Sequence, residues 1–460
     1  MDKLVLGIAP IKRSFLSMEA AKEQKDIFMK VVRGIRSDAV EIVDIDELCE
    51  NGIAFEYDTI QKVVDKFKDA RIDALFLPFC DFGEESVAAG IASQFQVPAL
   101  VWGPRDTMPN TDACRGRDTQ CGIIAATKVL SRRGIKFSYI VNSPAESEKF
   151  RNGFETFIRA AMVVKTMKNL RIAQIGNRPE PFMSVISNEG ELLERFGVQL
   201  VPVAISTIVN YTKQIVEENS EALQAYVMDF RERMDYFENM SDEQVVWSCA
   251  MTMAMEKAIV EKDCVAASME CWPRFEELKG IPCLGIGELT DRGIPVSCEG
   301  DVSGAITLAI MSACSLGDSS QFFADLTIRH PENDNAELLW HCGPFPYSLR
   351  EPEKKAGANA FNGRWELKKG NITICRFDSI EGNYVLFAGE GKATDGPETT
   401  GTYVWFETEN WEEWEEKLVF GPYIHHVGGM YGNYARALEE AARYLNVTFD
   451  TPGKNQIKGL

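Results

Sequence analysis

The chain has 460 residues, more than one ordinary domain holds, so we expect two or three domains. Its 45% hydrophobic and 26% charged residues are typical of a globular protein in water. A formal net charge of −20 argues against nucleic acid as a partner, because a phosphate backbone would be repelled. No apolar run is long enough to span a bilayer, and the start MDKLVLGIAPIKRS lacks a signal peptide. We therefore expect a cytoplasmic protein without a membrane partner.

The first third of the chain alternates short apolar runs with segments of helical periodicity. The segments Ser17–Gly34 and Thr59–Ala70 have helical spacing. Before, between and after them lie four Leu-rich or β-branched runs, at Leu4–Ile8, Val40–Val43, Ala74–Leu77 and Ala99–Trp102. Strands that alternate with helices predict a parallel sheet, and in such sheets function gathers at the carboxyl ends of the strands.

A second α/β pattern begins near Asn169, and a different pattern follows from about Phe361. The strands of the second α/β pattern are predicted at Arg171–Ile175, Val265–Ser268, Pro295–Cys298 and Phe322–Leu326, with a long helical region from about Tyr211 to Glu261 that is broken near Asn239–Asp242. The last part has short strands punctuated by Gly and Asn, closed by a helix at Tyr434–Leu445. The prediction is an α/β fold with two Rossmann-like domains containing parallel sheets, residues 1–168 and 169–350. A C-terminal antiparallel, barrel-like β domain, residues 351–460, completes it.

All four histidines of the chain lie in its last third: His330, His341, His425 and His426. Imidazole is the commonest transition-metal ligand in proteins, and acidic strand ends lie nearby in the sequence. At least one histidine is therefore predicted to bind a metal ion.

Two apolar runs between residues 294 and 326 each carry a carboxylate, one at the end of the run and one within it. The first run lies in the segment IPVSCEGDVSGAITLAI, where Glu299 ends the strand and is expected to point into a crevice. Asp301, two residues later, is either a site residue or the N-cap of the helix that follows. In QFFADL, Asp325 lies in a buried strand, where an ionisable group needs a partner. Carboxylates with imidazole suit Mn²⁺, Mg²⁺, Fe²⁺ or Co²⁺. Glu270, after another apolar run, is a further candidate for the pocket lining.

The twelve cysteines form no CxxC pair, so their spacing gives no indication of a structural zinc site. We interpret Cys271, Cys283 and Cys298 as buried packing residues and not as nucleophiles, because no histidine is adjacent to them in sequence.

Four segments carry a family resemblance: CEGDVSGAIT (298–307), FFADLT (322–327), WHCG (340–343) and IHHVGG (424–429). In this order and at these separations they resemble the metal-site series of the L-fucose isomerase and L-arabinose isomerase superfamily. The likeness is closest to the shorter L-fucose isomerase-like proteins. It extends to PALVWG near the end of the first hundred residues and to NGRWELKKGNITICRF in the last domain.

The resemblance implies a metal-dependent isomerase that interconverts an open-chain aldose and a ketose through a cis-enediol. It implies that Glu299, Asp325 and His426 bind the ion, with Mn²⁺ favoured and Mg²⁺, Co²⁺ or Fe²⁺ as alternatives. The two carboxylates would also shuttle protons. His341 is a fourth candidate ligand, because it matches a histidine that completes the site in the arabinose branch, although the fucose branch does not use an equivalent one.

The same resemblance implies that Arg13 and Trp102 reach the sugar from a neighbouring subunit of a homo-oligomer, a hexamer or a related assembly. The substrate would be similar to L-fucose, D-arabinose or L-arabinose. The arginine-rich segment 102–122 leaves two interpretations open for Arg105, Arg115 and Arg117: solvated loop charges, or a site for an anionic sugar such as sulfoquinovose. A sugar-binding protein without turnover is the alternative from another functional class.

Overall fold

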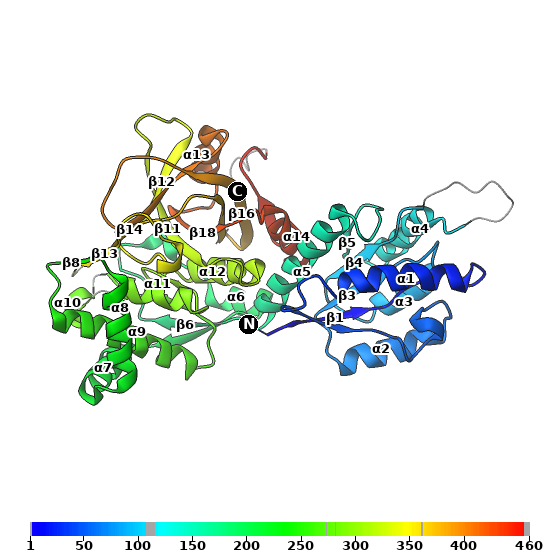
Figure 1. The fold of residues 1–460 in the computed structure, drawn as a ribbon, viewed down its shortest axis with the longest axis horizontal. Coiled ribbons are helices and arrows are strands. Elements are labelled where there is room, and N and C mark those ends of the chain that lie inside the picture. The colour runs from blue at the N-terminus through cyan, green and yellow to red at the C-terminus, as the bar shows by residue number, and fades with distance from the viewer. Residues whose placement is uncertain (1, 107–115, 273, 281, 360–361, 455–460) are drawn as a thin grey trace. The chain divides into compact units, whose positions relative to one another are not determined.

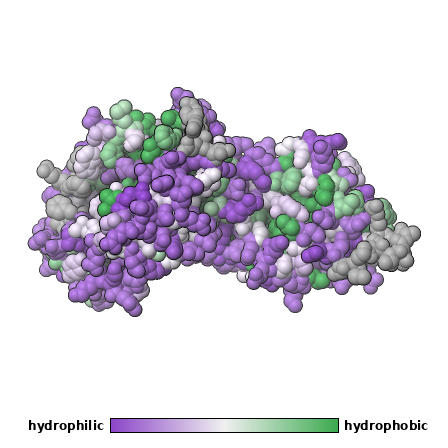
Figure 2. All heavy atoms as spheres, turned by 90° about the horizontal axis from the view of Figure 1, so that it is seen from above, coloured by the Kyte–Doolittle hydropathy of each residue, from purple (hydrophilic) through white to green (hydrophobic). Residues whose placement is uncertain are grey.

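The computed structural model describes residues 2–106, 116–272, 274–280, 282–359 and 362–454, and the chain divides into two compact units, Met1–Lys165 and Thr166–Leu460 (Figure 1). The further division of the second unit at residue 351 stays a prediction. Within the described ranges, no helix is both long and apolar enough to cross a membrane. Hydrophilic residues cover most of the face drawn in Figure 2.

The first unit is built on a parallel five-stranded sheet with the order β2-β1-β3-β4-β5. Its strands are β1 (Leu4–Ile8), β2 (Val40–Val43), β3 (Ala74–Pro78), β4 (Ala99–Trp102) and β5 (Ser138–Tyr139). They alternate with the helices α1 (Met18–Val32), α2 (Thr59–Asp69), α3 (Glu85–Ala92), α4 (Thr119–Arg132) and α5 (Glu148–Lys168). Every residue of β3 and β4 is buried, as expected for central strands of a parallel sheet that is covered on both faces.

The second unit starts with a parallel four-stranded sheet of order β10-β9-β6-β7. The strands are β6 (Arg171–Ile175), β7 (Gln199–Val203), β9 (Ala266–Met269) and β10 (Val296–Ser297). The helices of this part are α6 (Glu189–Phe196), α7 (Ile205–Glu218), α8 (Glu221–Arg233), α9 (Asp242–Val260), α10 (Phe275–Leu278), α11 (Pro282–Asp291) and α12 (Val302–Ser315). The predicted helical region near residues 211–261 is therefore three helices, α7 to α9, with the short strand β8 (Tyr236–Glu238) before the last.

Six of the described strands close into an antiparallel barrel, because β17 pairs with β12 on one side and with β16 on the other. The barrel strands are β11 (Gln321–Arg329), β12 (Ala336–His341), β15 (Asn371–Ile380), β16 (Asn383–Thr394), β17 (Thr402–Glu407) and β18 (His426–Tyr431). Its attached elements are β13 (Gly357–Asn359), β14 (Gly363–Glu366), β19 (Thr448–Asp450), α13 (Trp411–Phe420) and α14 (Ala435–Leu445). Two parallel sheets and an antiparallel barrel confirm the predicted fold class.

Strand β11 packs on both of its faces. Phe322 and Ala324 belong to the core that fills the barrel, whereas Phe323 belongs to the core of the parallel sheet. Alternate side chains of a strand point to opposite faces, so Asp325 lies on the same face as Phe323. The barrel thus presents Asp325 toward the layer that contains the parallel sheet.

Candidate metal centre

Four predicted site residues come together in the second unit, each from a different segment. Glu299 lies in the loop between β10 and α12, Asp325 in β11, His341 at the end of β12, and His426 at the start of β18. In the antiparallel pairing of β11 with β18, Asp325 is directly opposite His426. Opposite residues of an antiparallel pair point to the same face, so strand register alone brings these two side chains together.

The side-chain atoms converge at ligand-like separations. His426 Nε2 lies 3.1 Å from Glu299 Oε2 and 3.6 Å from Asp325 Oδ1. His341 Nε2 lies 3.8 Å from the same Asp325 oxygen. Ligands that share one ion through bonds of about 2.1 Å are themselves about 3.0–3.4 Å apart. The separations therefore fit a divalent ion after small movements of the side chains.

Two atoms of this group are buried without a hydrogen-bond partner, Asp325 Oδ1 and His341 Nε2. Leaving a buried polar atom unpaired costs about 1–3 kcal/mol, and more for a charged group. A cation at the convergence point would remove the cost at Asp325. The donor set of two carboxylates and an imidazole is also one that Mn²⁺ and similar ions accept.

A buried carboxylate fixes the orientation of His426. Asp301 accepts a hydrogen bond from His426 Nδ1 at 3.0 Å, and also one from the Gly304 backbone at 2.9 Å as the N-cap of α12. The predicted capping role of Asp301 is thus confirmed, but it is only part of what the residue does. Because Nδ1 donates its proton to Asp301, Nε2 is the nitrogen that faces Glu299 and Asp325, and its lone pair would be available to a metal ion that displaces the proton on Nε2.

Arg376, on β15, completes this support. Its guanidinium donates to Asp301 at 2.5 and 3.3 Å and to Asp378 at 2.8 Å, and the arginine is fully buried. Burial opposes ionisation of Asp301, but Arg376 and His426 outweigh it and hold the pKa of that carboxyl below its usual range. Sequence analysis missed Arg376, although a charged residue within the apolar strand ITICRF was a signal for it.

The pKa of His426 is raised to about 9, because its hydrogen bonds with Asp301 and Glu299 outweigh burial, which lowers it. The pKa of His341 is raised to about 10, since nearby Asp325 outweighs the effect of burial. The two imidazoles differ in their hydrogen bonds, however. The Cys342 backbone N–H donates to His341 Nδ1 at 2.9 Å, so the neutral ring carries its proton on Nε2, facing Asp325. At 3.8 Å, His341 Nε2 and Asp325 Oδ1 are beyond hydrogen-bond distance, but this geometry turns an N–H of His341, and not a lone pair, toward the Asp325 carboxylate.

The backbone at Glu299 is strained. Its φ of 60° is left-handed, which is uncommon for a residue with a side chain and concentrates at functional sites. Gly300 follows with a φ of 66°, and a Cβ there would lie 2.7 Å from the Asn177 carbonyl oxygen. The loop thus passes close to the loop after β6, and that close approach requires glycine.

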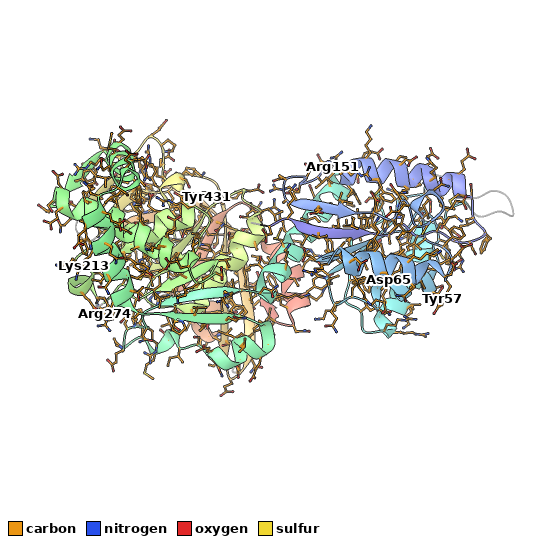
Figure 3. All side chains as sticks on the ribbon, turned by 90° about the horizontal axis from the view of Figure 1, so that it is seen from below. Tyr57, Asp65, Arg151, Lys213, Arg274 and Tyr431 are labelled. Carbon is orange, nitrogen blue, oxygen red and sulfur yellow. The ribbon has the colours of Figure 1, made fainter. Side chains whose placement is uncertain are left out.

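A cavity of about 550 Å³, which is in the range of small-ligand sites, lies beside this loop. Gly300, Glu270, Arg178 and Arg274 are among its lining residues, and the role of Glu270 in a substrate pocket stays a prediction. Glu270 accepts from Arg274 Nε at 3.0 Å and from the Asn177 backbone at 2.9 Å. The Arg274 side chain is labelled on the second unit in Figure 3.

The predicted substrate residues of the first unit have other partners within that unit. Arg13 pairs with Glu84 at 3.2 Å and lies over the Phe82 ring. Trp102 is fully buried and packs 4.4 Å from the Phe150 ring, measured between ring centroids, so in this structure it presents no surface to a sugar.

The arginine-rich segment is only partly described. Arg117 forms an ion pair with Asp106 at 3.0 Å and donates to the Arg105 carbonyl, and the Arg105 side chain is exposed. Arg115 lies outside the described residues. The roles predicted for Arg13, Trp102, Arg105 and Arg117 stay predictions.

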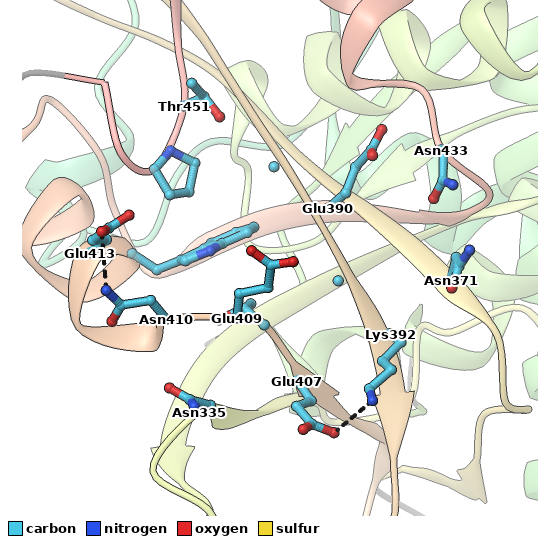
Figure 4. A pocket seen from close by; sticks show the side chains of 15 residues that line it. Asn335, Asn371, Glu390, Lys392, Glu407, Glu409, Asn410, Glu413, Asn433 and Thr451 are labelled. Atoms are coloured by element: carbon cyan, nitrogen blue, oxygen red, sulfur yellow. Dashed lines mark hydrogen bonds and ion pairs between the residues drawn. The ribbon is translucent and has the colours of Figure 1, made fainter.

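A larger cavity of about 850 Å³ lies on the barrel and is rich in carboxylates (Figure 4). Glu407 forms an ion pair there with Lys392 at 3.5 Å. Glu299, Asp325, His341 and His426 are not among the lining residues of this cavity or of the smaller one, and the proposed centre rests on the distances between their side chains.

Comparison with known proteins gives the family. Residues 7–168 match the N-terminal domain of fucose/sulfoquinovose isomerases, and residues 341–451 match the C-terminal domain of L-fucose isomerase. The chain belongs to the L-fucose isomerase-like family. It is therefore a sugar isomerase, of the aldose–ketose class of intramolecular oxidoreductases, which removes the alternative of a binding protein without turnover.

Relatives align along nearly the whole chain. The sulfoquinovose isomerases of Priestia aryabhattai and Priestia megaterium are each 25% identical over 459 residues, covering 97% of this chain and 99% of theirs. That of Alkalicoccus urumqiensis is 26% identical over 341 residues, covering 71% of this chain and 73% of its own. A solved periplasmic solute-binding protein of Actinobacillus succinogenes with bound D-allose is 14% identical, with 68% of this chain and 91% of that chain covered. Its TM-score of 0.17 is too low to support any conclusion.

Proposed function

We propose that this isomerase depends on a divalent metal ion, preferably Mn²⁺, held by Glu299, Asp325 and His426. The observation that carries the proposal is the approach of both carboxylates to His426 Nε2, Glu299 at 3.1 Å and Asp325 at 3.6 Å, together with the partnerless, buried Oδ1 of Asp325. The wholly oxygen and nitrogen donor set suits Mn²⁺, with Mg²⁺, Co²⁺ and Fe²⁺ as alternatives.

Aldose–ketose interconversion moves one proton between C1 and C2 of the sugar and another between O1 and O2. When bound, the ion supplies Lewis acidity toward two neighbouring sugar oxygens. Glu299 and Asp325, which both face the same point, then act as base and acid in alternation through a cis-enediol. His426 is held by Asp301 and keeps the two carboxylates and the sugar in a fixed relative position.

His341 takes a different part in this proposal. Its Nε2–H faces Asp325 at 3.8 Å, so it stabilises the carboxylate form of Asp325, which is the form that binds an ion and acts as a base. His341 is therefore a positioning residue and not an ion ligand.

The test uses matched substitutions of the four residues. Glu299→Gln and Asp325→Asn should lower kcat about 100- to 10,000-fold, the range of general acid–base catalysis, and should weaken Mn²⁺ binding. His426→Gln should lose the ion, whereas His341→Gln should keep it and lose activity. Metal content, calorimetric Mn²⁺ titration and ketose formation are measured on each folded variant. Near wild-type turnover in folded, metal-loaded Glu299→Gln would contradict the proposal.

For the substrate we propose an anionic sugar, sulfoquinovose, because relatives of that activity align over 97% of this chain. Neutral sugars similar to L-fucose, D-arabinose or L-arabinose are the alternative. The cavity beside Glu299 carries the guanidinium groups of Arg178 and Arg274, and guanidinium geometry suits a sulfonate. Arg274 is paired with the carboxylate of Glu270, whereas Arg178 donates through Nη1 to the backbone carbonyls of Pro179, Glu180 and Phe182, which are neutral, so Arg178 is the better candidate.

A panel of aldoses, with and without a sulfonate, tests this choice. Arg178→Ala should lower kcat/KM for sulfoquinovose about 10- to 100-fold, since a charge-assisted hydrogen bond contributes about 1.5–3 kcal/mol. The change for a neutral aldose should be small. The double variant Arg105→Ala, Arg117→Ala serves as the comparison, because it tests the anion site predicted from sequence. If only the double variant lost kcat/KM for sulfoquinovose selectively, the anion site would lie in the first unit, at Arg105 and Arg117, and not at Arg178. Turnover of neutral aldoses only would contradict the anionic substrate.

A further inference from the structure

Four cysteines meet directly behind the proposed metal centre. Cys271 lies just after β9, Cys283 in α11, Cys298 between β10 and Glu299, and Cys342 immediately after His341. The first three are buried, and Cys342 is partly buried. The residues come from four separate segments, which is why their spacing in the sequence gives no metal-site pattern.

The sulfur atoms form one cluster. Cys271 Sγ lies 2.9 Å from Cys298 Sγ, and Cys283 Sγ lies 3.2 Å from Cys342 Sγ. The sulfur atoms of Cys271, Cys283 and Cys298 all lie within 4.8 Å of one another. The sulfur atoms of Cys298 and Cys342 also lie within 4.8 Å of each other and of a ring nitrogen of His341. The four thiols are thus linked by short sulfur–sulfur distances, with Cys283 and Cys298 each near the other three.

A mononuclear zinc ion fits this spacing. Zinc bonds four thiolates tetrahedrally at about 2.3 Å, which places neighbouring sulfur atoms about 3.8 Å apart. The two closest pairs would need to open by less than about 1 Å to reach that value. Four thiolates around one ion are a closed, structural type of zinc site.

Neither apolar packing nor disulfide bonding accounts for this cluster as well as a bound ion does. Packing alone places single cysteines in apolar cores, as it does for Cys249 in the core of the barrel side of this unit. Two disulfides would join separate pairs, yet Cys298 approaches members of both pairs. One ion bound by all four cysteines would account for all of these short sulfur–sulfur distances.

We propose that Cys271, Cys283, Cys298 and Cys342 bind a structural Zn²⁺, distinct from the ion of the isomerase site. Thiolates select zinc, whereas the oxygen and nitrogen ligands at Glu299 and Asp325 select harder ions, so the two sites do not compete for one metal. Cys298 directly precedes Glu299 and Cys342 directly follows His341. The zinc ion would therefore cross-link the segments that follow β9 and β10, the helix α11 and the end of β12. Two of these segments also carry Glu299 and His341, so the zinc ion would help to hold both site residues in position.

The experiment measures zinc in the full-length wild-type chain, purified without chelator, by elemental analysis and X-ray absorption at the zinc edge. We expect about one zinc per chain, with four sulfur neighbours at about 2.3 Å. Cys271→Ser and Cys283→Ser should abolish stoichiometric zinc. Cys249→Ser, at an equally buried cysteine outside the cluster, should retain it. Glu299→Gln should also retain the zinc, so that failure of the isomerase-site proposal and failure of this one are distinguishable.

Three results would overturn the inference. The first is protein that contains no zinc, takes none up on addition, and alkylates at all of its cysteines when denatured without reductant. The second is a mass lowered by two hydrogens per lost thiol pair, which would show disulfides. The third is a zinc neighbour shell of nitrogen and oxygen in place of sulfur.

Discussion

His426 is the residue at which the support of the site can be followed atom by atom. One ring nitrogen faces the carboxylates of Glu299 and Asp325, and the other donates to Asp301. Asp301 in turn is held by Arg376, so a buried chain of charged groups orients one imidazole. Partners of this kind hold a metal-binding histidine in one tautomer and one ring orientation.

The two carboxylates that share Arg376 allow a matched test. Asp301→Asn removes the charge that holds His426, so Mn²⁺ affinity should fall about 10- to 100-fold. Asp378→Asn removes the other partner of Arg376 without touching His426, and should lower Tm while Mn²⁺ affinity stays near that of the wild type. Calorimetric Mn²⁺ titration and thermal unfolding separate the two effects. Equal Mn²⁺ affinities in both variants would show that Asp301 does not position the ligand.

At the scale of elements, the glycines of β18 bring the helix α12 and the barrel together. A Cβ at Gly428 would lie 2.5 Å from Met311 Sδ of α12, and one at Gly429 would lie 2.2 Å from the Phe322 ring in the barrel core. Both faces of the strand are thus closely covered. Because Asp301 caps α12 and His426 begins β18, the separation of these two elements sets the hydrogen bond between them.

Gly428→Ala should disturb that separation. The added methyl group must displace Met311 or the helix, and overpacking of this kind costs about 1–3 kcal/mol. We expect a lower Tm together with weaker Mn²⁺ binding, since the bond between Asp301 and His426 would lengthen. Gly190→Ala in α6, where the nearest atom is 3.5 Å away, is the control and should leave both unchanged or raise Tm slightly. If Gly428→Ala lowered Tm but left Mn²⁺ affinity unchanged, the packing of α12 against β18 would not control the position of His426.

Elements with a strong period were predictable from the sequence, and β18 shows why others were not. The strands at residues 4–8, 40–43, 99–102 and 171–175 were predicted at their observed bounds, because they are compact apolar runs. The strand β18 reads HVGGMY, whose two glycines weaken any strand signal; it forms because β11 and β15 pair with it on both sides. The hydrogen bonds to these two neighbouring strands, and not the local strand propensity of its residues, stabilise β18.

The site shows the same limit. Glu299, Asp325 and His426 were named from their motifs, and the structure brings their side chains together at His426 Nε2. The support by Arg376 and the cluster of four cysteines were missed. Asp301 and Arg376 are 75 residues apart, and Asp301 and His426 are 125 apart, so only the fold places them in contact.

At the scale of the whole molecule, the proposed centre needs two layers of the second unit at once. The loop after β10 of the parallel sheet supplies Glu299, while the barrel strands β11 and β18 supply Asp325 and His426. Neither layer contains a complete donor set. The residues with the proposed substrate role, Arg13 and Trp102, belong to the first unit. The resemblance assigns them to the site of a neighbouring copy, so the functional molecule would be a homo-oligomer.

Mixing two inactive variants tests that assignment. Arg13→Ala and Glu299→Gln should each be inactive alone. If Arg13 of one copy serves the Glu299 site of another, random co-assembly in equal amounts makes about a quarter of the sites intact, because each site draws its two residues from independent copies. Activity per chain should therefore recover to about a quarter of the wild-type value. The control is a mixture of Glu299→Gln with Asp325→Asn, whose residues lie in one centre of one chain, so that no site is restored. No recovery in the first mixture, with co-assembly shown by native mass measurement, would place Arg13 and Glu299 in the same chain's site.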